Sequence, residues 1–268
     1  MSESNTSPSH SLEVWTTKPI ERGLVGRFFN WAGSTVVRLG LRFEIRGEEN
    51  LPADAPYILA PNHETYVDGM LIGMGLKKAH FDRLTSLAAR ELEESHGLFG
   101  KIIMRVGRGI PIDRAGSSIQ SLKICIHQLE EGNILLIHPE GTRSPDGKLG
   151  KIRDGCSFIA RHADCPVVPC FLDGGYEIFS RHMKVPQLRR SFWHRRRLIL
   201  TYGKPLYPRD YKNTKELTEA LSAWLHDMYA NKEVPREYTG KNLAYMEKRR
   251  QRQEKRAGKA LPEDESED

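Results

Sequence analysis

Residues 57–76, with the sequence YILAPNHETYVDGMLIGMGL, determine how the chain is organised. The apolar residues 57–60 are followed by Pro61, and a short apolar run that proline stops is typical of a buried strand. Residues 67–76 then place apolar side chains on one face at helical spacing, namely Val67, Met70, Leu71 and Met74. The stretch therefore predicts a buried strand, a polar turn over residues 62–66 and a helix in direct succession.

The same alternation of strand and helix continues along the chain. Short apolar runs predict further strands at residues 41–45, 84–88, 110–112, 133–137, 166–172 and 198–202. Helical spacing predicts helices at residues 117–131, 155–163 and 215–229, the last of which Thr214 can cap. This order predicts an α/β fold, a single layered domain with a largely parallel or mixed central sheet flanked by helices.

An N-terminal amphipathic helix precedes this domain, within residues 18–47. A polar stripe of Arg27, Asn30, Ser34 and Arg38 runs along it, and the remaining positions are mostly apolar. Such a helix either lies in a membrane interface, with Trp31 near the boundary, or packs as an ordinary helix on the domain. The chain has no apolar stretch of the length of a transmembrane helix, and its polar residues 1–12 predict that there is no signal peptide. We therefore expect a peripheral or monotopic protein on the cytoplasmic side of a membrane.

Composition sets the remaining boundaries. Residues 1–17 are polar and predicted to be disordered, residues 48–235 form the predicted domain, and residues 236–268 form a charged flexible tail that can begin as a helix. The net charge of +6 hides two basic clusters, at residues 189–197 and 248–259. Each suits anionic lipid or nucleic acid, or is simply a solvated face. The 4 cysteines have no C-x-x-C spacing, which indicates reduced thiols and no zinc site.

His63 and Asp68 are the first candidate functional pair. Residues five apart on one continuous helix point in different directions, so the two side chains meet only if His63 lies on the turn that leaves the strand and Asp68 in the first turn of the helix. Thr65 is a candidate cap for that helix. The carboxylate then fixes the imidazole tautomer and leaves the other ring nitrogen free to accept a proton.

The second candidate segment is residues 139–144, PEGTRS, which directly follows the apolar strand 133–137. Ligands bind at the carboxyl ends of strands in open α/β sheets. Arg143 offers a guanidinium suited to phosphate, Glu140 can orient it or accept from a substrate hydroxyl, and Gly141 allows a tight loop that continues through Thr142. A third segment, residues 109–114, ends in Arg114, a second candidate phosphate ligand or a surface ion pair.

These segments together resemble the glycerolipid acyltransferase family typified by 1-acylglycerol-3-phosphate acyltransferases. The family's N-H-x4-D, G-x-x-x-[IV]-D-R, F-P-E-G-T-R-S and apolar-proline blocks are similar, in that order, to residues 62–68, 109–114, 138–144 and 167–169. The likeness covers residues 48–230. The chain departs from the pattern at His138, where the family usually has Phe, and at Pro111, where it has a bulky apolar residue.

The resemblance implies transfer of a fatty acyl group from acyl-CoA or acyl carrier protein to the free hydroxyl of a lysophospholipid, first of all 1-acylglycerol-3-phosphate, to give phosphatidic acid. It implies His63 as general base oriented by Asp68, and Arg114 and Arg143 as ligands of the acceptor phosphate, positioned by Glu140. No covalent intermediate, metal or further cofactor is implied, and the expected partners are a lipid surface, the acceptor and the donor, without nucleic acid. Two alternatives remain: an acyltransferase for a different lipid acceptor, and a module without catalysis that binds membrane or nucleic acid.

Overall fold

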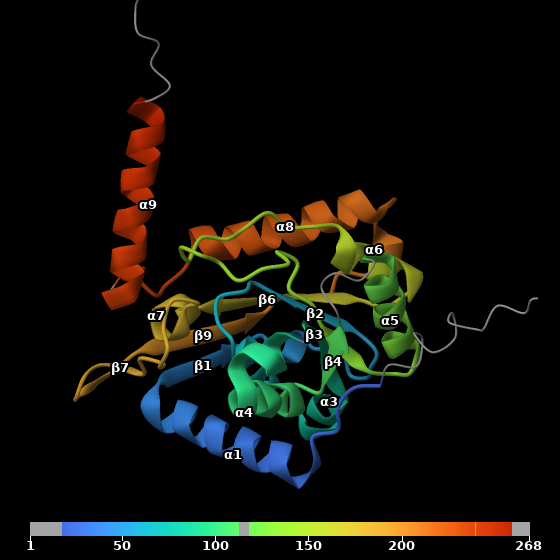
Figure 1. Cartoon of the computed structure of the whole chain (residues 1–268). Coiled ribbons are helices and arrows are strands. Elements are labelled where there is room, and N and C mark those ends of the chain that lie inside the picture. Colours follow the sequence, from blue (N-terminus) through green and yellow to red (C-terminus); the bar gives the residue numbers. More distant parts are fainter. Residues whose placement is uncertain (1–17, 90, 113–117, 239, 259–268) are drawn as a thin grey trace, which may run out of the picture.

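The computed structural model describes residues 18–89, 91–112, 118–238 and 240–258. Within these residues seven strands form one sheet that helices cover on both faces (Figure 1), so the predicted α/β fold is confirmed. The predictions for residues 1–17 and for the end of the tail lie outside the described residues. Across the sheet the strands are ordered β1 (Arg42–Arg46), β9 (Arg197–Tyr202), β6 (Val167–Asp173), β2 (Ile58–Pro61), β5 (Ile134–Leu136), β3 (Leu84–Ala89) and β4 (Gly109–Ile112).

The sheet is mixed, because one neighbouring pair runs antiparallel. β6 and β9 are antiparallel, with Phe171 opposite Thr201, and every other pair in the sheet is parallel. The strands β2, β3, β4, β5 and β6 therefore all point the same way, and their carboxyl ends meet at one edge. A separate short hairpin is formed by β7 (Arg189–Ser191) and β8 (His194–Arg195).

The core lies in two layers, one on each face of the sheet. Successive side chains of a strand point to opposite faces, so Tyr57 and Leu59 join one apolar cluster while Ile58 and Ala60 join the other. Both faces of the strand are thus buried, which explains why it reads as a continuous apolar run. Most helices likewise pack on one or the other of these two faces.

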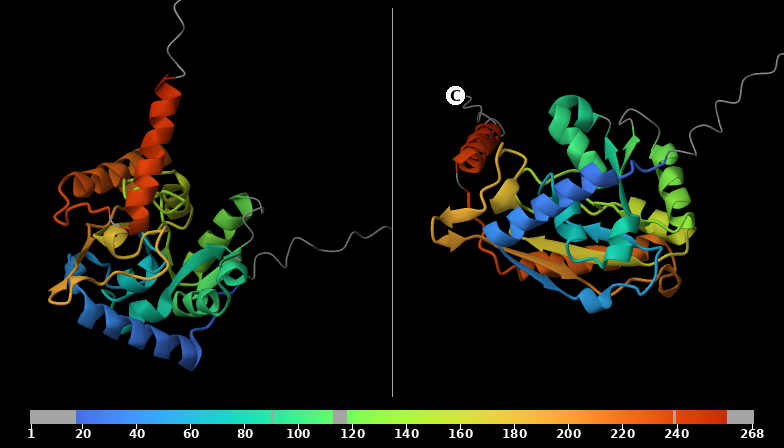
Figure 2. Two further views of the ribbon diagram at one scale, coloured as in Figure 1. Left: turned by 60° about the vertical axis from the view of Figure 1, so that its left-hand side comes forward. Right: turned by 90° about the horizontal axis from the view of Figure 1, so that it is seen from below.

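The helices of the first face are α1 (Gly23–Gly40), α2 (Asp68–Gly73), α3 (Lys78–Arg83) and α4 (Glu91–Val106), which is interrupted at Gly97. The second face carries α5 (Ser118–Glu130), α6 (Gly155–His162) and α8 (Thr214–Ala230), as Figures 1 and 2 show. The short helix α7 (Gly175–Phe179) follows β6, and short 3-10 turns occupy Glu48–Asn50 and Pro208–Asp210. Asn213, rather than the predicted Thr214, caps α8, because its side chain accepts from the Glu216 N–H.

The N-terminal helix α1 packs on the domain through small residues and turns its large apolar side chains outward. A Cβ atom on Gly33 would lie 2.7 Å from the sulfur of Met70, so a larger residue here would have to displace the Met70 side chain of α2. Arg27 and Arg38 of the predicted polar stripe are exposed, whereas Asn30 and Ser34 are half-buried. The exposed apolar side chains of α1 are Leu24, Val25, Phe28, Phe29, Trp31, Val36 and Leu39. Among the described residues, no helix is long and apolar enough to cross a membrane.

The predicted tail contains a long helix, α9 (Gly240–Gly258), that projects from the body of the molecule (Figure 1). Its first turns contact the domain: Asn242 accepts from the Ser180 hydroxyl, and the ring of Tyr245 stacks on His182. Arg249, further along, forms an ion pair with Asp146. A segment predicted as a charged tail that can begin as a helix therefore attaches to the loop that follows β5.

Candidate active site

The sheet brings the two principal sequence motifs together at one edge. His63 lies just after β2 and Glu140 just after β5, and these strands are parallel neighbours. The backbone N–H of His63 donates to Oε1 of Glu140 over 2.8 Å, and the N–H of Ser144 donates to the carbonyl of His63 over 2.8 Å. Segments almost 80 residues apart in the chain thus form one loop cluster at the carboxyl ends of the strands.

The predicted contact between His63 and Asp68 is confirmed. Asp68 is the first residue of α2, and its Oδ2 lies 2.8 Å from Nδ1 of His63. A carboxylate only accepts, so Nδ1 carries the hydrogen and the lone pair is left on Nε2. The pair therefore has the tautomer and orientation of a histidine that can take a proton from a substrate.

Asp68 is held by its own turn as well as by the imidazole. Its carboxylate accepts from the Glu64 N–H at 3.0 Å, from the Thr65 N–H at 3.1 Å and from the Thr65 hydroxyl at 2.6 Å. Burial raises the pKa of Asp68, but hydrogen bonds from His63 and Thr65 and the neighbouring imidazoles outweigh burial, and the net pKa is lowered. Thr65 does not occupy the N-cap of α2 as predicted. Val67 does, and Thr65 accepts from its N–H while donating to Asp68.

A second imidazole, that of His138, stacks on His63. The ring centroids are 3.6 Å apart with an interplanar angle of 13°. Nδ1 of His138 lies 3.2 Å from the carbonyl oxygen of Asn62, to which it donates. Burial first, and then the charge that His63 carries when protonated, lower the pKa of His138 to about 3, so this ring stays neutral.

His63, Asp68 and His138 each place one potential ligand atom within 4.8 Å of the others. The two rings lie in nearly parallel planes, so their in-plane lone pairs run side by side instead of converging on one ion. This geometry fits a packed proton acceptor better than a metal centre. The sequence signalled His138 only through its departure from the family pattern.

Glu140 connects two loops through backbone groups. Its Oε1 accepts from the His63 N–H, and its Oε2 accepts from the Gly150 N–H at 2.6 Å. Burial raises the pKa of Glu140, and these two hydrogen bonds oppose the rise. The following Gly141 has a φ of 72°, a conformation that favours glycine, and its N–H closes a turn onto the His138 carbonyl. The carboxylate thus braces the turn that carries His63 instead of contacting Arg143.

Arg143 precedes Ser144, whose N–H donates to the carbonyl of His63, and no ion pair of Arg143 is found among the described residues. Its Cζ lies 3.4 Å from the centroid of the Tyr66 ring, and its Nη1 is buried without a hydrogen bond to any described residue. A guanidinium with a free buried nitrogen beside the His63 turn is a candidate ligand for an anionic group. Thr142, next to it, is exposed. Arg114 lies outside the described residues.

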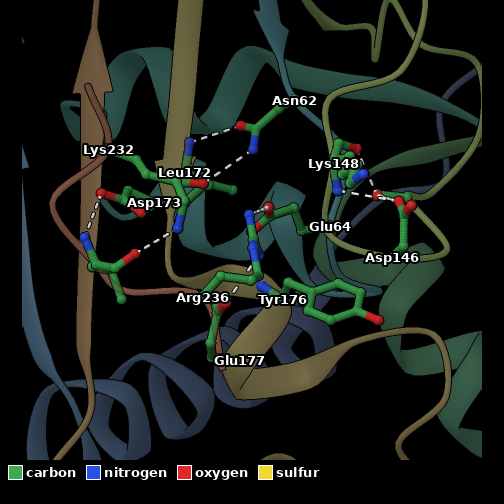
Figure 3. Close-up of polar contacts among 12 residues, drawn as sticks. Asn62, Glu64, Asp146, Lys148, Leu172, Asp173, Tyr176, Glu177, Lys232 and Arg236 are labelled. Carbon is green, nitrogen blue, oxygen red and sulfur yellow. Dashed lines mark hydrogen bonds and ion pairs between the residues drawn. The ribbon is translucent and has the colours of Figure 1, made fainter. Parts of the chain in front are cut away.

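A buried polar network that includes Asn62 and Glu64, the two neighbours of His63 in the chain, holds the turn (Figure 3). The side chain of Asn62 exchanges two hydrogen bonds with the backbone of Leu172 in β6, at 2.7 and 3.0 Å. Glu64 accepts from the Tyr176 N–H at 2.8 Å and from Arg236 at 3.2 Å, and Arg236 also pairs with Glu177 at 3.0 Å. Burial raises the pKa of Glu64, against the opposing charge of Arg236. No pattern in the sequence connects residues 64 and 236, so sequence reasoning missed this support.

Comparison with known proteins gives this site its context. Residues 42–173 match the family model described as Acyltransferase. The chain is 27% identical to the 1-acyl-sn-glycerol-3-phosphate acyltransferase of Bacillus subtilis over 74% of this chain and 94% of that protein. It is 33% identical to the enzyme of the same name from Pseudomonas aeruginosa, but over only 56% of this chain and 55% of that protein.

The fold is also similar to a solved structure. The crystal structure of the 1-acyl-sn-glycerophosphate acyltransferase PlsC from Thermotoga maritima superposes with a TM-score of 0.59 and 23% identity, covering 78% of this chain and 80% of that one. The matched family region contains His63, Asp68 and the loop with Glu140 and Arg143. These comparisons show that residues 42–173 of this chain match the Acyltransferase family model and that its fold is similar to that of PlsC.

Proposed function

We propose that this protein transfers an acyl group from a thioester donor to the free hydroxyl of 1-acylglycerol-3-phosphate, with His63 as general base. The observation that carries the proposal is the contact between His63 Nδ1 and Asp68, which leaves Nε2 as the proton-accepting nitrogen. The names of the Bacillus subtilis and Pseudomonas aeruginosa relatives support the choice of acceptor. The unpartnered Nη1 of Arg143 supports an acceptor that carries phosphate.

The chemistry requires one proton to move in two steps. Nε2 of His63 takes the proton of the acceptor hydroxyl as its oxygen bonds to the thioester carbonyl carbon. The carbon–sulfur bond then breaks, and the imidazolium returns the proton to the leaving thiolate. Asp68, buried and ionised, stabilises the positive imidazolium between the two steps. The enzyme itself forms no covalent bond to the acyl group.

The test is acyl transfer by the purified chain, with lysophosphatidic acid and an acyl-CoA, followed through both phosphatidic acid and free thiol. We expect His63→Ala to lower the rate by at least about a hundredfold, in the range of a positioned general base. His226→Ala, at an exposed position on α8, is the matched control and should leave the rate unchanged. Near-full activity of the His63 variant would remove the assigned base.

The same assay separates the alternatives. Transfer to other lysophospholipids but not to lysophosphatidic acid would assign a different acceptor, and thiol release without any acceptor would indicate a thioesterase. Binding to lipid without turnover of any thioester would identify a module that lacks catalysis.

We further propose that α1 attaches the enzyme to a lipid surface. Its outward face is apolar, with Trp31 64% and Leu24 88% exposed, and such a face is typical of a helix that lies in the membrane interface. The basic cluster at residues 189–197 contributes less than its sequence indicates. Arg196 pairs with Glu237, and Arg197 pairs with Glu44 and Glu233.

Liposome sedimentation tests this attachment. Leu24 and Trp31 are exposed, so the double substitution Leu24→Ser and Trp31→Ser removes apolar surface without disturbing the core. We expect it to weaken binding to vesicles that contain anionic phospholipid. Leu243→Ser, at an exposed leucine on α9, is the control, and equal binding by all variants would contradict the role of α1.

A further inference from the structure

A cavity of about 620 Å³ lies between the loop that follows β5 and the helix α9. Its lining includes four cationic side chains, Lys148, Lys151, Arg153 and Arg249. The first three belong to the loop. Arg249 comes from α9, well beyond the region that matches the acyltransferase family. The volume is within the usual range of small-molecule sites, roughly 300 to 1,000 Å³.

The acids of the lining are occupied elsewhere. Glu140 directs its two oxygens at the N–H groups of His63 and Gly150. Asp146 is buried, pairs with Arg249 and accepts from the Lys148 N–H at 3.2 Å.

The three cations of the loop, unlike Arg249, form no ion pair with a described residue. Lys148, Lys151 and Arg153 are exposed, and none of them forms an ion pair within the part of the chain that the structure describes. The cavity therefore presents an excess of unpaired positive charge, which suits a ligand with several phosphate charges.

This cavity is separate from the guanidinium assigned to the acceptor. Arg143 does not line it, but stacks on Tyr66, a residue that packs against the core layer shared with α1. α1 and α9 lie on opposite sides of the molecule (Figures 1 and 2). Thr142 and Ser144, the neighbours of Arg143, line the cavity, so the two anion sites adjoin each other on one loop while their cationic side chains differ.

We infer that the cavity binds the phosphate-bearing nucleotide end of an acyl-CoA donor, an inference that rests on the proposed acyl transfer. Two phosphate-bearing substrates need two anion sites, and Arg143 already serves one. Glu140 lines the cavity and accepts from the His63 N–H, so the cavity adjoins the turn that carries the proposed base. A concave basic cavity fits a nucleotide more closely than it fits the convex surface of a carrier protein.

The first measurement is binding of CoA, without acceptor or turnover, to the full chain by calorimetry. We expect the double substitution Lys151→Ala and Arg153→Ala to raise the Kd for CoA at least about tenfold, because each charged hydrogen bond lost is enough for that factor. Dephospho-CoA, which lacks the 3′-phosphate, should bind more weakly than CoA to the wild type. Lys255→Ala, an exposed lysine further along α9, is the control and should bind CoA normally.

Kinetics then identify the source of the phosphate. The double variant should raise KM for acyl-CoA and leave KM for lysophosphatidic acid unchanged. A rise only in KM for the acceptor would assign the cavity to the lipid phosphate. A loss of activity confined to acyl carrier protein as donor would assign the cavity to that protein. Either result overturns the inference, as does unchanged CoA binding. The wild type could bind CoA without transferring an acyl group, while the double variant fails to bind CoA. That result would refute the proposed reaction but support the nucleotide site.

Discussion

Replacing Asp68 with asparagine tests whether the negative charge of the carboxylate, and not only its shape, stabilises the protonated imidazole of His63. Asparagine has the same size, and its oxygen can still accept from Nδ1 of His63 if the amide nitrogen turns toward Thr65. The Thr65 hydroxyl can then accept instead of donating. The substitution therefore keeps the imidazole in place and removes mainly the negative charge beside it.

The size of the effect follows from the geometry. His63 Nδ1 and Asp68 Oδ2 are 2.8 Å apart, so the charge centres of the imidazolium and the carboxylate are about 4 Å apart, which gives about 4 kcal/mol at an effective dielectric constant of about 20. The lower bound is the loss of a charge-assisted hydrogen bond, about 1.5 kcal/mol. Because about 1.36 kcal/mol corresponds to a tenfold change in rate, kcat should fall by about tenfold to about a thousandfold.

The assay is the rate of thiol release with saturating lysophosphatidic acid, together with circular dichroism to verify the fold. Asp54→Asn makes the same chemical change at an exposed loop position and should leave kcat unchanged. If Asp68→Asn keeps kcat within a factor of about two of the wild type, the carboxylate does not stabilise the imidazolium and the reasoning is wrong.

Three further results are expected. His138→Phe should retain most of the activity and the wild-type pH profile, because His138 is neutral and acts through its stacking on His63, whereas His138→Ala should lower kcat. Asn62→Ala should lower the free energy of unfolding in urea by about 2–3 kcal/mol, since it leaves the buried N–H and carbonyl of Leu172 without their partner. Wild type should have a larger free energy of unfolding than Asp68→Asn at about pH 6, and the difference should shrink at about pH 3. Folding lowers the pKa of Asp68, so its carboxylate stabilises the protein above the unfolded pKa. That contribution is lost as the pH falls through the folded pKa.

The matching controls use exposed residues of the same type. Asn231→Ala, at the exposed end of α8, should change the unfolding free energy by less than Asn62→Ala. His194→Phe, on the exposed hairpin, should leave kcat as it is. A shifted pH profile in His138→Phe would show that this ring takes part in proton transfer, and a stability difference between wild type and Asp68→Asn that grows in acid would contradict the lowered pKa of Asp68.

Most strands and helices of the domain could be predicted because local patterns encode them. The apolar run before Pro61 becomes β2, and the helical stripe after Thr214 becomes α8, with bounds close to those expected. The sequence did not predict α3, α4, α7 or the hairpin β7–β8. Gly97 interrupts α4, and the hairpin strands are exposed, short and rich in arginine, so neither shows a clear apolar period.

In the candidate site, too, contacts between residues close in the chain could be predicted and contacts between distant loops could not. The spacing of His63 and Asp68, with Pro61 between strand and turn, was enough to predict their contact, because five residues of chain limit where they can lie. The bonds of Glu140 to two backbone N–H groups were not predictable, since they depend on how two loops meet above adjacent strands.

The sequence by itself determined the α/β class, the strand–turn–helix that holds His63 and Asp68, and the division of α1 into a polar stripe and apolar positions, because each depends on neighbours a few positions apart. Packing decided that the apolar positions of α1 face outward. Only the tertiary structure decided that His138 stacks on His63, that Arg236 supports Glu64, and that Arg249 of α9 reaches the loop after β5. These contacts join residues about 75 to 170 positions apart. Periodicity reports only which face of an element is buried, and the packing of the whole chain selects the partner.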